Sequence, residues 1–270
     1  MTLKEAIGRL ELAGIDEPRL EARQIFRHIG KIPSYMLVGN PDKISSGEVD
    51  FAVERRCKRE PLQYIIGEVD FYRESYRVTP DCLIPRQDTE LLVDYAVRNI
   101  PCGKKFLDLC TGSGCVAIST LKNTKQTYAV GYDISKGAIE LARENAERNG
   151  VSDRLRLVRA DLMSSVADGD GVFAVLSNPP YVSEKEYEEL QPEIAYEPTG
   201  AFVGGADGGD FYRKFIPDYK DIIADEGFIA FEIGCKQGAL MRELSELWQM
   251  KLEIISDIEG RERVAVFRKK

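Results

Sequence analysis

The spacing of apolar residues near the start of the chain predicts α-helices. One helical face is formed by four apolar side chains: Leu3, Ala6, Ile7 and Leu10. That spacing is typical of an amphipathic helix, and Thr2 with Glu5 has the spacing of a capping box. Two further helices of this kind are predicted, one after Pro18 and one after Ser45. We therefore predict a helical bundle over residues 1–62. Because no catalytic residue types line up in it, we expect it to dock a substrate.

A different pattern begins after the predicted bundle. Short runs of β-branched and aromatic residues at 64–66, 71–72 and 76–78 predict strands that form a hairpin. We expect this hairpin, residues 63–80, to link the bundle to a second domain over residues 81–270.

The second domain alternates predicted strands and helices. Strands are predicted near residues 105–109, 127–132, 155–159, 172–177 and 227–233. This alternation implies right-handed crossovers and a parallel sheet with helices on both faces. Two final apolar runs, 252–255 and 264–267, flank a turn at Glu259-Gly260, so we expect a hairpin that adds one antiparallel strand. The predicted fold class is α/β, with a seven-stranded and mostly parallel sheet.

Composition narrows the classes of function. The 270 residues are 43% hydrophobic and 30% charged, which is typical of a globular protein. No apolar segment follows the first five residues and no long apolar run occurs, so we expect no signal peptide, no transmembrane helix and a cytoplasmic location. A formal net charge of −8 disfavours non-specific binding of a phosphate backbone. We therefore expect no direct nucleic-acid partner.

The cysteines and the histidine do not form a metal-binding pattern. The six cysteines contain no CxxC pair, and the chain has one histidine, His28, which lies in the predicted bundle. We therefore expect no metal site.

The most distinctive segment of the chain is Asn178-Pro179-Pro180-Tyr181, which follows the apolar run 172–176. Prolines have no backbone donor, so the predicted strand ends at Asn178. In an open parallel sheet, ligands bind just past the carboxyl ends of the strands. There the Asn178 side-chain oxygen and the Pro179 carbonyl would accept hydrogen bonds from a planar NH₂ group, and Tyr181 would pack against it. For the tetrapeptide alone, a strand-ending turn with a packed tyrosine is the alternative interpretation.

A second candidate site is the turn Cys110-Thr111-Gly112-Ser113-Gly114, which follows the first strand of this domain and precedes a helix. Glycines allow a ligand close to the backbone, and a helix N-terminus favours negative groups. Acids follow successive strands, and we expect Asp133 to accept ribose hydroxyls and Asp161 to lie near an adenine, with Leu162 beside it. Asp108 would neutralise an ammonium group, directly or through water. Taken singly, such acids are more often caps or solvated charges.

The ligand of this turn has two interpretations. Gly112, Gly114 and Ala117 also fit the spacing of a dinucleotide fingerprint, which would indicate an NAD oxidoreductase. Hydride transfer would then lack an obvious acid, because the one histidine lies in the predicted bundle. A methyl donor such as S-adenosylmethionine gives every candidate residue a role, with Asn178 facing the sulfonium methyl. The sequence therefore favours the methyl donor.

These residues resemble the class I methyltransferases and, within them, the HemK-type release factor glutamine methyltransferases. Besides Asn178 to Tyr181, the similarity is carried by segments across nearly the whole chain: 60–67, 80–86, 108–114, 197–198, 204–208, 232–234 and 260–264. The segments 60–67 and 80–86 are the more specific, because nucleic-acid amino-methyltransferases share Asn-Pro-Pro-Tyr. The resemblance implies a Rossmann-like methyltransferase domain.

The resemblance also implies an activity and a partner. The activity is methylation of the side-chain amide nitrogen of the glutamine in the Gly-Gly-Gln motif of peptide chain release factors, with S-adenosylmethionine as the donor. Asn178 to Tyr181 would bind the glutamine, and Arg86 would help to close the pocket. We expect a monomer. Two alternatives remain: methylation of an exocyclic amine in DNA or RNA, and a non-catalytic module that binds release factors.

The chain departs from the family pattern at two places. The family has glycine where this chain has Cys110, and Pro-Glu where it has Gln87-Asp88. If position 110 needs a positive φ, a side chain there would strain the turn and weaken donor binding. Asp88 keeps the negative charge with a shorter reach.

Overall fold

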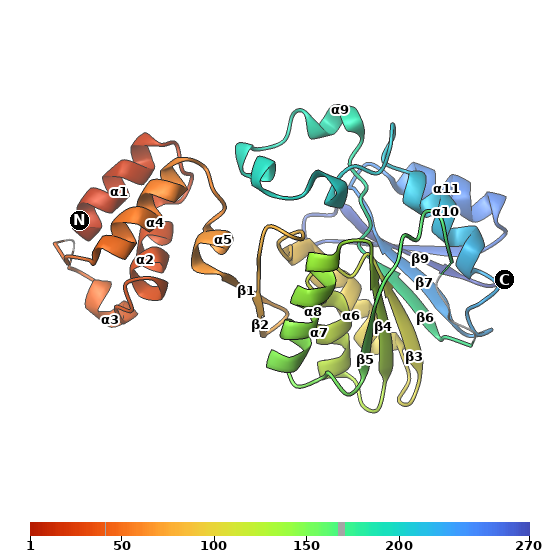
Figure 1. The fold of residues 1–270 in the computed structure, drawn as a ribbon. Coiled ribbons are helices and arrows are strands. Elements are labelled where there is room, and N and C mark those ends of the chain that lie inside the picture. Colours follow the sequence, from red (N-terminus) through yellow and green to blue (C-terminus); the bar gives the residue numbers. More distant parts are fainter. Residues whose placement is uncertain (41, 167–170) are drawn as a thin grey trace. The chain divides into compact units, whose positions relative to one another are not determined.

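The computed structural model describes residues 1–40, 42–166 and 171–270. The chain divides into two compact units, shown with their elements in Figure 1. The first unit combines Met1–Glu68 with Gln191–Tyr196, and the second combines Val69–Leu190 with Glu197–Lys270. A short segment from the second half of the sequence therefore belongs to the N-terminal unit.

The first unit is helical. Its elements are α1 (Leu3–Leu12), α2 (Pro18–His28), α3 (Ser34–Leu37), α4 (Gly47–Cys57), α5 (Leu62–Ile66) and the 3₁₀ turn η2 (Pro192–Tyr196). The predicted capping box is present, because Glu5 N donates to Thr2 Oγ1 and Thr2 N donates to Glu5 Oε2. The core of the unit is made by the predicted helical faces, with Leu10, Ile25 and Phe26 fully buried.

One predicted strand in this region is wrong. Residues 64–66 lie in the helix α5, which follows Pro61 and ends at Gly67 in a left-handed conformation with φ of +86°. Leu62 and Ile65 of this helix pack into the core of the helical unit. Tertiary burial has therefore overridden the β propensity of the isoleucines.

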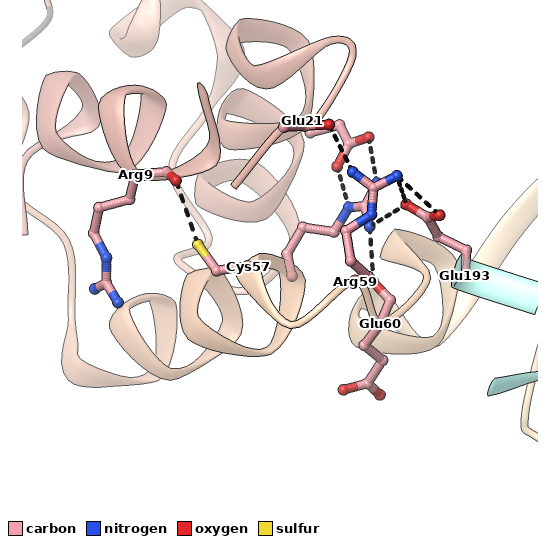
Figure 2. A network of polar contacts seen from close by, with 8 residues as sticks. Arg9, Glu21, Cys57, Arg59, Glu60 and Glu193 are labelled. Carbon is pink, nitrogen blue, oxygen red and sulfur yellow. Dashed lines mark hydrogen bonds and ion pairs between the residues drawn. The ribbon is translucent and has the colours of Figure 1, made fainter. Parts of the chain in front are cut away.

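A buried ion-pair network fastens η2 within the helical unit (Figure 2). Arg56 is only 6% exposed, and its Nη1 lies 3.0 Å from Glu193 Oε1 while its Nε lies 2.5 Å from Glu21 Oε2. Arg59 contributes a second cation, with Nη2 at 2.8 Å from the same Glu193 oxygen. Each buried charge is thus paired, as its desolvation requires.

A two-stranded hairpin, β1 (Glu68–Phe71) and β2 (Glu74–Arg77), precedes the large sheet. The predicted hairpin is confirmed. The helices and 3₁₀ turns that follow are η1 (Gln87–Thr89), α6 (Glu90–Asn99), α7 (Cys115–Asn123), α8 (Lys136–Arg148), α9 (Glu184–Tyr187), η3 (Thr199–Ala201), α10 (Asp210–Tyr219) and α11 (Gly238–Leu247).

The predicted seven-stranded sheet is confirmed. Its strands are β3 (Lys105–Leu109), β4 (Tyr128–Asp133), β5 (Leu155–Arg159), β6 (Ala174–Ser177), β7 (Phe228–Glu232), β8 (Lys251–Ser256) and β9 (Glu262–Arg268). They lie in the order β5-β4-β3-β6-β7-β9-β8, and β9 runs antiparallel to both of its neighbours. The strand order reverses between β3 and β6, which is where an open α/β sheet forms its ligand crevice.

Each face of the sheet has its own apolar core. Alternate residues of one strand point to opposite faces, so Phe106 packs with α6, α7 and α8 whereas Leu107 packs with α10 and α11. Figure 1 shows these two helical layers on either side of the sheet. Because apolar side chains pack against both faces of the sheet, the strands are held in place up to their ends at the point where the strand order reverses.

No helix in the described ranges combines the length and the apolar character that crossing a membrane requires.

Candidate active site

A cavity of about 520 Å³ lies at the carboxyl ends of β3, β4, β5 and β6. Its lining comes from segments that are far apart in the sequence: 81–89, 110–116, 132–138, 160–163, 178–180 and 198–203, together with Phe211. Both predicted sites, the glycine turn and the Asn-Pro-Pro corner, therefore border one cavity.

The alignment of β3 with β6 brings the two sites together. Leu109 of β3 is in register with Ser177 of β6, and Ser177 Oγ donates to the Leu109 carbonyl at 2.6 Å. The next residue on each strand, Cys110 and Asn178, lines the cavity.

Cys110 adopts the left-handed conformation, in which a side chain strains the turn. Its φ is +58°, and it precedes Gly112 at +54° and Gly114 at +81°. A non-glycine residue in this region costs roughly 1–2 kcal/mol. Among the described residues of the turn, Cys110 therefore carries the conformational strain, while its side chain borders the cavity.

Asp108 lies beneath the turn and does not line the cavity. Its Oδ2 accepts from the Thr111 hydroxyl at 2.6 Å and from the Ala117 amide at 3.1 Å, and the side chain is 1% exposed. Burial raises the pKa of Asp108 to about 7, against the opposing effect of these hydrogen bonds. Asp108 thus holds the turn to the first turn of α7.

Asp133 borders the cavity beside the turn and is anchored by backbone amides. Its Oδ2 accepts from Gly112 N at 2.9 Å, and its Oδ1 accepts from Ser135 N at 2.9 Å. Burial raises the pKa of Asp133 above its ordinary value, while these amides oppose the rise. Each carboxylate oxygen keeps a further lone pair for a ligand hydroxyl.

Asp161 and Leu162 lie along the same wall of the cavity. Asp161 is exposed, and its carboxylate accepts from Met163 N at 3.0 Å and from Ser164 Oγ at 2.9 Å. Leu162 is 6% exposed and supplies an apolar surface. A flat, partly polar group such as a purine matches this combination.

Asn178 is half-buried at the cavity, and its Nδ2 donates to Thr89 Oγ1 at 3.1 Å. Pro180 lines the cavity as well, whereas Pro179 is buried and lies outside the lining. Thr89 precedes α6, and its side chain makes no cap bond with that helix. The hydroxyl serves Asn178 instead.

Tyr181 lies behind the corner, outside the lining of the cavity, and packs against the core of the sheet. Its hydroxyl donates to Glu232 Oε1 at 3.2 Å. Glu232 is 1% exposed, and its Oε2 is without a hydrogen-bond partner in the described chain. Burial raises the pKa of Glu232 to about 7, while the hydroxyls of Thr89 and Tyr181 lower it. Sequence reasoning gave neither Glu232 nor Thr89 a role in the site, although Glu232 ends an apolar strand.

Arg86 lines the cavity and forms an ion pair with the buried Glu197. The other Glu197 oxygen accepts from Ile84 N at 2.9 Å, so the 84–86 loop is fixed at two points. Asp88, one of the departures from the family pattern, pairs with Arg263 at 3.0 Å. Its shorter side chain therefore still reaches a cation.

The residues fit S-adenosylmethionine. Small-molecule sites have volumes of roughly 300–1,000 Å³, and this cavity is of that size. A glycine turn at a helix N-terminus suits the amino-acid portion, Asp133 suits ribose hydroxyls, and Asp161 with Leu162 suits a purine. Across the described ranges, no cluster of three or more metal-ligating side chains occurs.

The fold and the site define a methyltransferase. The solved structure of the hMettl16 catalytic domain in complex with a MAT2A 3′UTR hairpin has a TM-score of 0.58 at 13% identity, covering 83% of this chain and 82% of that one. The ribosomal protein L11 methylase from Lactobacillus delbrueckii subsp. bulgaricus has a TM-score of 0.50 at 20% identity, covering 72% and 85%. The Rossmann-like class I methyltransferase fold predicted from the sequence is confirmed.

Sequence similarity identifies the family. The model of the PrmC N-terminal domain matches residues 2–67, and that of the methyltransferase small domain matches residues 87–196. The release factor glutamine methyltransferase of Nitratidesulfovibrio vulgaris is 36% identical, with 99% of this chain and 94% of that protein covered. That of Geobacter sulfurreducens is 39% identical, with 85% and 82% covered. The chain belongs to the release factor glutamine methyltransferase family.

Proposed function

We propose that this protein transfers the methyl group of S-adenosylmethionine to the side-chain amide nitrogen of the glutamine in the Gly-Gly-Gln motif of peptide chain release factors. The observation that carries the proposal is the shared cavity, in which Asn178 lies beside the glycine turn. The related proteins named above are release factor glutamine methyltransferases, which supports this choice of substrate.

The donor would be held by the end of the cavity that is built from backbone. Gly112, with its neighbours Thr111 and Ser113, would contact the amino-acid portion, Asp133 would accept from the ribose, and Asp161 would lie near the adenine. When bound, the donor supplies an electrophilic methyl group on a sulfonium. Asp108 would act one layer below by holding the turn in place.

The acceptor would be held by Asn178. An amide nitrogen is a poor nucleophile because its lone pair is delocalised into the carbonyl. The Asn178 Oδ1 atom can accept one of the two amide hydrogens, since its Nδ2 is engaged by Thr89, and the Pro179 carbonyl is our proposed acceptor for the other. A nitrogen held in this way would face the methyl carbon in line, and such orientation can contribute about 7–11 kcal/mol in well-fitted cases.

The bonds of the reaction balance without a metal or a redox partner. A bond forms between the amide nitrogen and the methyl carbon, and the carbon–sulfur bond breaks with its electron pair remaining on sulfur. The nitrogen then loses one proton to water, which leaves S-adenosylhomocysteine and a neutral N5-methylglutamine. Tyr181 and Pro180 would shape the corner, and Arg86, held by Glu197, would fix one wall.

The helical unit offers no part of the cavity described above, so we propose that it docks the protein substrate. Residues 1–62 would then be the docking domain, 63–80 the linking hairpin and 81–270 the catalytic domain, acting as a monomer.

The direct test uses labelled S-adenosylmethionine. The purified protein is incubated with a release factor and, separately, with DNA and RNA, and the label is mapped by mass spectrometry. We expect label on the glutamine of the Gly-Gly-Gln motif and none on nucleic acid. Label on an exocyclic base amine, or no transfer to any release factor, would contradict the proposal.

A further inference from the structure

Segments 204–208 and 232–234 carry part of the family resemblance, yet they lie outside the lining of the cavity. The side chain of Gln237, the residue before α11, contacts the first of these segments and binds the residue that ends the second. We propose that Gln237 is a positioning residue, which binds the main chain of the Asn-Pro-Pro-Tyr corner and so fixes where the Asn178 and Pro179 oxygens point. This inference rests on the proposed function, because it concerns how the acceptor amide is oriented.

The corner has few hydrogen-bond donors of its own. Neither Pro179 nor Pro180 has a backbone N–H, so the main chain of these two residues offers acceptors alone. Groups of this kind are held in place by donors from other parts of the chain. At Tyr181, which ends the corner, the carbonyl accepts from Gln237 Nε2 at 2.9 Å. The side chain of Gln237 therefore supplies a donor to the main chain of the corner.

The contacts of Gln237 fix the orientation of its carboxamide. Its Nε2 also donates to the Gly208 carbonyl at 3.2 Å, and its Oε1 accepts from Gly234 N at 2.9 Å. Carbonyl oxygens only accept and a backbone N–H only donates, so the reverse orientation would set donor against donor and acceptor against acceptor. Gln237 thus joins three separate loops, one of which is the corner with Tyr181.

The loop before α10 packs closely on the main chain of the corner. Gly204 N donates to the carbonyl of Val182, the residue after the corner, at 2.9 Å. A Cβ atom at position 208 would lie 2.0 Å from the Tyr181 carbonyl oxygen and 2.8 Å from Gln237 Nε2. Glycine at this position therefore leaves room for the bond between Gln237 and Tyr181.

The two ends of the corner are fixed separately. At its start, Ser177 Oγ donates to the Leu109 carbonyl at 2.6 Å, which holds the end of β6 beside β3. At its far end, Gln237 binds the Tyr181 carbonyl. Between these points the proline rings restrict φ, so the direction of the Asn178 oxygen depends on both ends. A shift of about 1 Å in such a group can lower a rate roughly 100-fold.

The test removes the donors of Gln237. Gln237→Met keeps a side chain of similar length without a donor, and we expect kcat to fall roughly tenfold or more. Since Gln237 lies outside the lining of the cavity, the dissociation constant of S-adenosylmethionine should change less than about twofold, and the KM for a release factor less than about threefold. Turnover is counted per S-adenosylmethionine site measured by calorimetry, so unfolded protein does not contribute.

A second variant keeps one of the contacts. Gln237→Glu retains an oxygen for Gly234 N but has at most one hydrogen for the two carbonyls, so it should also lose kcat. Gln126→Glu is the control for the chemical change, because Gln126 is exposed in the turn before β4. This control should keep wild-type kcat.

A pair of glycines tests the same contact from the other side. Gly208 and Gly150 have nearly the same φ, +74° and +70°, so alanine brings similar backbone strain to both. At position 150 the added Cβ meets open space among the described residues, whereas at 208 it meets the Tyr181 carbonyl. We expect kcat per donor site to fall roughly tenfold or more in Gly208→Ala and to stay at the wild-type value in Gly150→Ala.

The outcomes distinguish the two levels of inference. If the wild-type protein transfers methyl groups and Gln237→Met keeps its kcat, or Gly208→Ala matches Gly150→Ala in kcat, the positioning role is wrong while the proposed function stands. A loss of donor affinity as large as the loss of kcat would also overturn it, since Gln237 would then support the whole domain. If the wild-type protein itself transfers nothing to a release factor, the proposed function fails and this inference fails with it.

Discussion

The two ends of the cavity are built by different means. At the donor end, the main chain shapes the surface of the site through a turn with positive φ at Cys110, Gly112 and Gly114 and through the amides that fix Asp133, while Asp108 holds the turn from below. At the acceptor end, side chains hold side chains, with Asn178 on Thr89 and Tyr181 on Glu232.

This difference has a chemical reason. A donor with many hydroxyls and charges needs a close surface at several points, and backbone supplies it once the turn has formed. An amide acceptor needs oxygens aimed at its two hydrogens. We propose that the Pro179 carbonyl supplies one of these oxygens and that Asn178 Oδ1 supplies the other, because Asn178 Nδ2 is held by Thr89. Substitutions at the donor end should therefore change the affinity for S-adenosylmethionine. Substitutions at the acceptor end should instead change kcat.

The largest effect is expected for Asn178→Ala. Because Asn178 would hold the reacting nitrogen, kcat should fall on the order of 100-fold or more, with donor affinity nearly unchanged. Initial rates with a release factor, together with calorimetric titration of S-adenosylmethionine, measure the two quantities. A variant with normal kcat would remove Asn178 from the mechanism.

Asp133→Ala should give the opposite pattern. Loss of the carboxylate removes the proposed ribose contact and the anchor of Gly112 N, so the donor dissociation constant should rise roughly tenfold or more. At saturating donor, kcat should recover much of its value. Asp153→Ala, an exposed position in a turn, is the matched control. Unchanged donor affinity in Asp133→Ala would contradict the assignment.

A third prediction concerns the buried carboxyl beneath the acceptor end. The folded-state pKa of Glu232 is about 7, above its ordinary value of 4.5, because of burial. The folded protein therefore binds more protons than the unfolded chain between these values, and stability is lost as pH rises from about 4.5 to 7. The Tyr181 hydroxyl donates to Glu232 Oε1, and the charges of Asp88 and Arg263 act on this pKa in opposite directions, Asp88 raising it and Arg263 lowering it.

The glutamine side chain in Glu232→Gln cannot ionise, so this variant should not lose stability as the pH rises through that range. Its unfolding free energy relative to the wild type should increase with pH by at most about 1.4 kcal/mol per unit across that window, and level off above it. Denaturant unfolding at pH 5, 6, 7 and 8 measures the difference. A difference that does not vary with pH would mean that Glu232 keeps an ordinary pKa.

The smallest effect is expected for Cys110→Gly. Glycine adopts a φ of +58° without strain, so the variant should be more stable by about 1 kcal/mol, with kcat unchanged and donor binding equal or tighter. Cys102→Gly is the control, because Cys102 is exposed and lacks a positive φ; it should be neutral or slightly destabilised. A destabilised Cys110→Gly would show that packing of the thiol outweighs the strain.

Much of this architecture is predictable from local patterns. The predicted strands at 105–109 and 155–159 have the same bounds as β3 and β5, and the strand-terminating prolines located the end of β6. The glycine turn was found because it joins an apolar strand to a helix. Residues 64–66 were missed because their burial against the helical core outweighs isoleucine's preference for strands.

The contacts that the sequence did not predict join distant residues. Arg86 and Glu197 are 111 residues apart, and Thr89 and Asn178 are 89 apart. Nothing local distinguishes Thr89 from an ordinary helix cap, and only the fold brings it to Asn178. The sequence thus predicted which residues border the cavity better than it predicted the side-chain contacts that hold those residues in place.

The central claim is that Asn178 presents its oxygen to the acceptor amide beside the donor turn. The most direct measurement is a crystal structure of the protein with S-adenosylhomocysteine and a Gly-Gly-Gln peptide. We expect the glutamine NH₂ nitrogen at about 3 Å from Asn178 Oδ1, with the Asn178 NH₂ group still on Thr89. A glutamine side chain bound elsewhere, or held through Asn178 Nδ2, would contradict the claim.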